Sequence, residues 1–244
     1  RIRDLEKAVE NKRRERKRGQ KQARRASSKP TIDITNCAVS RVANEAEAAL
    51  VKAGVELYQR GGELVHVVRD VQGAAAEWLI RPPGAPTIRL VAEGYLVELM
   101  ERVATWERTV EGTDGEIKSC PVVPPKWAFA ALSGRGAWKF PRLEAVVEAP
   151  CFLVDGSILD KPGLDRRTGL LYEPGDVVFP PIPASPTRED GLRALAELRE
   201  VFADFPFKAP HHKSAAIGGV LSLVGRYAIP GGVPMHGVSA HAAG

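Results

Sequence analysis

Histidines and aspartates are the residues of this sequence whose side chains could bind a metal or transfer protons. The histidines are His66, His211, His212, His236 and His241. His211 and His212 are adjacent, so on a helix their side chains point about 100° apart and do not easily share one metal ion. His66 alternates with Leu64 and Val68 in ELVHVV, which predicts a partly buried residue of a strand.

Four aspartates in the second half of the chain invite a metal or acid–base interpretation: Asp155, Asp160, Asp165 and Asp176. Their spacing matches no calcium-binding loop, and glycine or proline lies close to each of them, where aspartate favours turns. No serine lies in a GxSxG motif, and Cys37, Cys120 and Cys151 form no CxxC pair. The sequence therefore predicts no catalytic residue and no metal site, and its cysteine usage fits a reducing cytoplasm.

The last residues have the composition of the start of a phosphate-binding loop. Such a loop needs a buried strand, a tight glycine turn, and then Gly-Lys-Ser/Thr at the start of a helix. Residues 234–240 would form the strand. The loop would begin with His241, Ala242, Ala243 and Gly244, and the glycine–lysine step would lie beyond them.

The charge of the chain is concentrated at its N-terminus. Residues 1–30 hold 13 Lys/Arg and 4 Asp/Glu, whereas the other 214 residues hold 22 and 26, so net charges of +9 and −4 make up the total of +5. This composition is typical of a solvated linker and also of an arm that contacts nucleic acid phosphates. The predicted contacts are Lys12, Arg13, Arg14, Arg16, Lys17, Arg18, Arg24 and Arg25.

Residues 31–140 predict a compact α+β module that follows a helical or disordered linker over 1–30. TIDIT predicts a strand, and 39–53 and 93–106 predict helices with one apolar face each. Arg60-Gly61-Gly62 separates two β-rich segments, which predicts a hairpin, and 87–91 predicts a further strand. Residues 111–119 predict a loop, and 126–132 a short helix after Pro125.

Residues 141–244 have a different sequence pattern from residues 31–140. The Pro- and Gly-rich stretch 141–186 predicts short strands around a turn at Asp155-Gly156 and then an extended strap. Thr187 and Asp190 form a capping box for a helix to about 204, with Leu192, Leu195, Leu198, Val201 and Phe202 expected to be buried. A second helix is predicted over about 211–227. The apolar stretch 215–225 is too short to cross a bilayer.

Several segments, in this order, resemble a known family. They are VDGSILDKPGLDRRTGLLY (154–172), FPPIPASPTREDGLRALAELREVFADFPF (179–207), KSAAIGGVLSLVGRYAI (213–229) and GVPMHGVSAHAAG (232–244). Together they are similar to the region before the ATPase core of phage- and mobile-element-encoded primase–helicase proteins, replicative helicases of the poxvirus and phage type. Looser similarity extends back to about residue 55, and Leu164 stands where the family pattern has an aromatic residue.

The resemblance implies a role for each part. The basic arm would connect to an upstream primase-type head, residues 31–140 would lie between head and motor, and 187–244 would be the helical lead-in and first strand of a truncated P-loop ATPase domain. The isolated chain, which begins at Arg1, would then be a cytoplasmic, non-catalytic fragment without a cofactor of its own. The parent would use ATP and Mg²⁺, act on DNA during replication, and assemble as a homo-oligomeric ring.

Two other hypotheses stay open. A stand-alone nucleic-acid-binding or adaptor protein would act through the basic N-terminal arm, and its DNA binding would fall steeply with salt. A small enzyme would need a catalytic site, and the sequence offers no positive feature for one.

Overall fold

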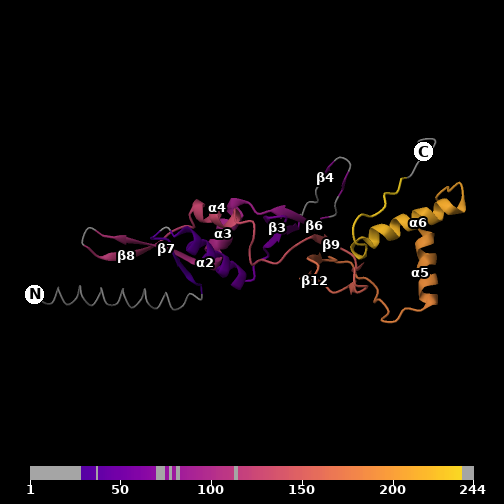
Figure 1. The fold of residues 1–244 in the computed structure, drawn as a ribbon, viewed down its shortest axis with the longest axis horizontal. Coiled ribbons are helices and arrows are strands. Elements are labelled where there is room, and N and C mark those ends of the chain that lie inside the picture. The colour runs from indigo at the N-terminus through magenta and orange to yellow at the C-terminus, as the bar shows by residue number, and fades with distance from the viewer. Residues whose placement is uncertain are drawn as a thin grey trace, which may run out of the picture. The chain divides into compact units, whose positions relative to one another are not determined.

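The computed structural model shows a mixed α+β fold (Figure 1). It describes residues 29–36, 38–69, 75–76, 79–80, 83–112 and 115–237. These residues form two compact units. Unit 1 comprises the chain up to His66 together with Arg89–Pro141, and unit 2 comprises Val67–Ile88 together with the chain from Arg142 onward.

Three helices surround the core of unit 1. They are α2 (Val39–Lys52), α3 (Glu93–Val103) and α4 (Lys126–Ser133). Helix α2 buries Val42, Ala46, Ala49 and Leu50, and α3 buries Leu96, Leu99 and Met100, so each apolar face predicted from helical spacing is the buried face.

A three-stranded sheet completes this core. Strand β1 (Thr31–Asp33) pairs in parallel with β7 (Thr105–Glu111), which pairs antiparallel with β8 (Ile117–Pro121). The helix predicted over 93–106 therefore ends at Val103, and strands take up both ends of the loop predicted over 111–119. The helical spacing continues to Trp106, but pairing with β1 and the bond from the Trp106 indole N–H to the Met100 carbonyl, at 3.1 Å, place that residue in a strand. The β7–β8 hairpin projects away from the helices (Figure 1).

The predicted hairpin around Arg60-Gly61-Gly62 is present. Strand β2 (Tyr58–Arg60) pairs with β3 (Glu63–Arg69), and β6 (Pro86–Leu90) is the third strand of this sheet. Gly61 and Gly62 have φ values of 57° and 82°, as a two-residue turn with two left-handed positions requires. Strands β4 (Ala75–Ala76) and β5 (Leu79–Ile80) form a separate antiparallel pair.

Unit 2 contains two small sheets over 145–172. Strands β10 (Cys151–Phe152) and β11 (Ile158–Leu159) form a hairpin, and β12 (Gly163–Asp165), β13 (Leu170–Tyr172) and β9 (Ala145–Val147) form a sheet in that order. They share a core of Val147, Cys151, Leu153, Leu159, Leu170 and Tyr172. Within the stretch 141–186, the longest run with neither helix nor strand is 173–186, which follows the last strand of these sheets.

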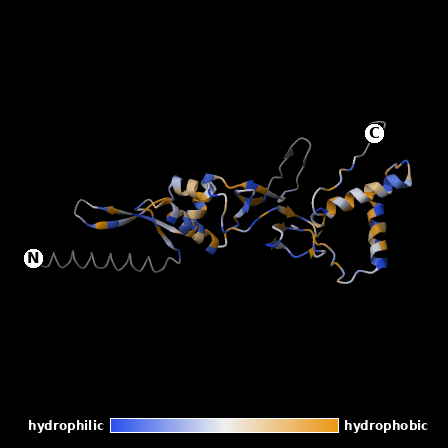
Figure 2. Ribbon diagram, viewed as in Figure 1, coloured by the Kyte–Doolittle hydropathy of each residue, from blue (hydrophilic) through white to orange (hydrophobic). Residues whose placement is uncertain are grey.

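Helix α5 (Arg188–Glu200) begins at the predicted capping box, because Thr187 and Asp190 exchange both hydrogen bonds. The prediction that α5 is a buried helix was wrong, since none of its residues is buried against the described chain. Helix α6 (Pro210–Val224) and the short helix η1 (Arg226–Ala228) follow, and Tyr227 packs on the sheet core. Figure 2 shows hydrophobic residues along both α5 and α6.

The segment after η1 does not form the predicted buried strand in its described part. Residues 233–237 are in neither helix nor strand, and Met235 is 97% exposed. The segment nevertheless folds back onto α6. A Cβ atom placed on Gly219 would lie 3.2 Å from Cγ of His236, a close contact, so the ring of His236 lies against this glycine.

Candidate functional site

The residues predicted to contact nucleic acid and nucleotide lie outside the described part of the chain. This applies to the eight basic residues of the arm, from Lys12 to Arg25, and to His241, Ala242, Ala243 and Gly244. The motifs between 154 and 172 and the helix pair after them are described, and the site is built from these.

The Asp-Gly-Ser motif closes the β10–β11 hairpin. Oδ1 of Asp155 accepts hydrogen bonds from the Ser157 amide at 3.0 Å and from the Ser157 hydroxyl at 2.6 Å. Gly156 has φ of 80°, a left-handed value that permits this turn. The motif therefore shapes the turn through the aspartate side chain, as its sequence predicted.

The DRRTG motif closes the β12–β13 hairpin in a similar way. The two carboxylate oxygens of Asp165 accept from the Arg167 amide at 3.1 Å and from the Thr168 hydroxyl at 2.7 Å. Gly169 has φ of 74° and donates its amide to the Asp165 carbonyl at 2.8 Å. Asp165 therefore also acts as a turn residue, which confirms the interpretation from sequence.

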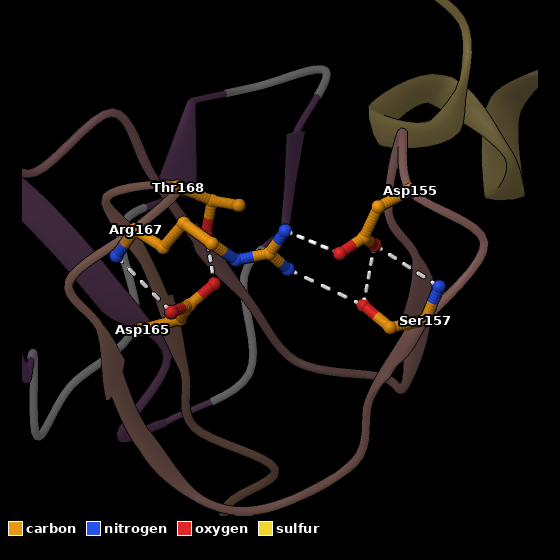
Figure 3. Close-up of polar contacts among 5 residues, drawn as sticks. All are labelled: Asp155, Ser157, Asp165, Arg167 and Thr168. Carbon is orange, nitrogen blue, oxygen red and sulfur yellow. Dashed lines mark hydrogen bonds and ion pairs between the residues drawn. The ribbon is translucent and has the colours of Figure 1, made fainter.

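Arg167 joins the two turns (Figure 3). Its guanidinium donates Nη1 to Oδ2 of Asp155 and Nη2 to the Ser157 hydroxyl, the latter at 3.3 Å. We call this set of residues, Asp155, Ser157, Asp165, Arg167 and Thr168, the motif clasp. Its sequence signal was the repeated Asp-turn pattern, but the contact across ten or more residues could not be read from spacing.

The polar side chains of the motif clasp bond to one another, which leaves them unsuited to catalysis. Hydrogen bonds from Ser157 and then the Arg167 guanidinium lower the pKa of Asp155 to about 2. The Thr168 hydroxyl is the main cause that lowers the pKa of Asp165. Both carboxylates are ionised at neutral pH and cannot donate a proton, and their oxygens already accept bonds from within the clasp. The clasp therefore orders the two hairpins. No group of three metal-ligating side chains lies together among the described residues.

Trp106 and Trp138, each of which has a basic residue nearby in the sequence, belong to the core of unit 1. Trp106 and Trp138 are buried, and the indole N–H of Trp138 donates to the Leu132 carbonyl at 2.6 Å. His66 is half-buried, as predicted, and its ring stacks on Tyr95 with centroids 4.4 Å apart. Burial and then the charge of Arg89 lower the pKa of His66.

The turn between α5 and α6 gathers aromatic and basic side chains. The rings of Phe205 and Phe207 lie 4.6 Å apart, and those of Phe202 and Phe207 6.0 Å apart. His211 and His212 follow, edge to face at 4.3 Å. This aromatic group was not predicted from the sequence, although DFPF followed by KAPHHK is the pattern that could have indicated it.

Comparison with protein-family models, curated proteins and solved structures finds no match to this chain. None of the helices in the described part has the length and hydropathy needed to span a bilayer.

Proposed function

We propose that this chain is part of a phage or mobile-element primase–helicase that acts in DNA replication, and that unit 2 leads into its ATPase core. The observation that carries the proposal is the exposed apolar surface of the helix pair. On α5 and α6, the described structure leaves the following side chains 39–76% exposed: Leu192, Leu195, Leu221, Leu223 and Val224, with Val201 just after α5. Large apolar side chains exposed on two successive helices favour an interface.

The backbone of α6 and the segment after it supports the same proposal. In a P-loop ATPase, a strand lies beside helices and delivers the phosphate-binding loop at its end. Here the segment that runs toward His241–Gly244 returns to α6, with His236 against Gly219. In the proposal, this segment becomes a strand when the neighbouring strands of an ATPase sheet pair with it.

In the proposal, residues 1–244 and the ATPase core after Gly244 would have separate roles. This chain would contribute no catalytic residue of its own. The lysine and Ser/Thr that bind nucleotide phosphates and Mg²⁺ would follow Gly244, and the parent protein would be a cytoplasmic, DNA-bound homo-oligomeric ring. The basic arm, with its net charge of +9, would supply phosphate contacts to DNA.

The decisive experiment extends the chain along its gene. We expect Gly-Lys-Ser or Gly-Lys-Thr within three codons after Gly244, and DNA-stimulated ATP hydrolysis by the extended protein that Lys→Ala in that step abolishes. In the extended protein, amides of α5 and α6 should exchange with deuterium more slowly than in residues 1–244. A stop codon after Gly244, or unchanged exchange in both helices, would refute the proposal.

The charge asymmetry favours one second candidate, an adaptor that binds nucleic acid through residues 1–30 alone. In that case, deletion of 1–30 abolishes DNA binding, and log K falls with log salt concentration with a slope of about −0.9 for each duplex phosphate neutralised. DNA binding that survives the deletion counts against this candidate.

A further inference from the structure

The turn between α5 and α6 presents aromatic rings on the surface of unit 2. We call residues 201–213 the aromatic–basic turn. Its backbone is held by bonds from the amides of Phe202 to Arg199 O, at 3.1 Å, and of Phe207 to Phe205 O, at 2.8 Å. Phe205 is 50% exposed although its ring contacts Phe207. Phe205 therefore combines contact with a neighbouring ring and exposure to solvent.

Basic side chains continue from these rings without interruption by acidic ones. Lys208, His211 and His212 are exposed, and Lys213 is half-buried. The first turn of α6 contains no acidic residue, and Asp204 is the one carboxylate of the aromatic–basic turn. Figure 2 shows the hydrophilic start of α6 next to this turn. The surface thus places stacking groups beside positive charges.

We propose that the aromatic–basic turn binds single-stranded nucleic acid, with a base stacked on Phe205 and neighbouring phosphates held by Lys208 and Lys213. Proteins that hold single strands combine aromatic rings, which stack on any base, with basic groups that follow the backbone. A duplex buries the faces of its bases, so it offers nothing to the phenyl ring. This inference rests on the proposed function in one respect: the proposed function identifies the single strand as replicating DNA.

The charges distinguish this occupant from a protein surface. An apolar protein partner would gain from Phe205 and from the leucines of α5, but it would have to desolvate Lys208 and Lys213. A single strand instead uses both kinds of group at once. The leucines of α5, assigned above to the ATPase core, are not part of this surface.

The test is photocrosslinking of residues 1–244 to 5-iodouracil-substituted oligo(dT), followed by peptide mapping. We expect crosslinks in the peptide that contains Phe205. Phe205→Leu, which keeps the apolar volume but not the ring, should remove the crosslink and weaken oligo(dT) binding about tenfold, and Phe205→Trp should restore both. Leu192→Ala is the matched control, since this α5 side chain is about as exposed but not aromatic.

The lysines are tested through salt dependence. Lys208→Gln with Lys213→Gln should reduce the magnitude of the slope of log K against log salt by about 1.4, because each single-strand phosphate contact contributes about 0.7. Crosslinks confined to residues 1–30, equal loss with Leu192→Ala, or equal competition by duplex DNA would each overturn the inference. These outcomes leave the ATPase proposal intact, because that proposal is tested by the codons after Gly244.

Discussion

Glu47 is the charged side chain that the described part of unit 1 buries, and its removal should destabilise that unit strongly. Glu47 is only 4% exposed to solvent. One carboxylate oxygen accepts from the Lys139 amide at 2.6 Å, and the other pairs with the Arg135 guanidinium at 2.8 Å. Arg135 also donates to the Asn44 amide oxygen at 2.8 Å. These bonds tie the loop after α4 to α2.

The expected cost follows from what Glu47→Ala leaves behind. The Lys139 amide loses its acceptor, and the Arg135 guanidinium loses its counter-charge while only 22% of that side chain is exposed. Breaking a buried ion pair by removing one partner costs about 3–5 kcal/mol, and the partial exposure of Arg135 places the expected value near 3 kcal/mol. Glu47→Gln keeps the shape and one acceptor, so about 1–2 kcal/mol is expected.

The matched control lies on the same helix. Glu45 pairs with Arg41 at 3.0 Å, but both side chains are about 40% exposed. An exposed i,i+4 pair contributes about 0.3–0.5 kcal/mol, so Glu45→Ala should change the free energy of unfolding by no more than that.

Urea unfolding followed by tryptophan fluorescence is the assay, because unit 1 contains Trp106, Trp127 and Trp138, three of the four tryptophans of the chain. Equal costs for Glu47→Ala and Glu45→Ala, or a cost below about 1 kcal/mol for Glu47→Ala, would refute the reasoning that burial makes this pair important.

Three further predictions concern unit 2. Arg167→Ala should lower the melting temperature and speed amide exchange over 145–172, whereas Arg166→Ala, for which the described structure shows no ion pair, should not. The pKa of Asp155 lies below its ordinary value of 3.8, so its contribution to stability is complete above that pH and is lost as the pH falls toward 2; Asp155→Asn should flatten a melting-temperature profile in this window. Gly169→Ala should cost about 2 kcal/mol or more by thermal unfolding, because its φ is left-handed and its Cβ would meet another side chain at 3.0 Å, whereas Gly175→Ala, left-handed but open, should cost about 1 kcal/mol.

Local signals in the sequence predicted much of the fold. The capping box at Thr187, the paired glycines after Arg60 and the apolar face of α2 each act over a few residues, and the structure contains all three. The helix expected to reach Trp106 failed because strand pairing with β1, some 70 residues away in the chain, outweighs the local period. The motif clasp shows the same limit, since Asp155 and Asp165 were identified as turn residues but Arg167 was not seen to connect them.

The same amphipathic pattern has opposite outcomes in the two units. Helix α2 buries its apolar face against α4 and the sheet of unit 1, whereas α5, with leucines at comparable spacing, buries none of its residues in the described structure. A helical period therefore identifies which face requires a partner, but not where the partner lies. The uncovered face of α5 indicates that this helix has a partner, because burying its exposed leucines would be favourable. In the proposal, the ATPase core is the partner that buries them.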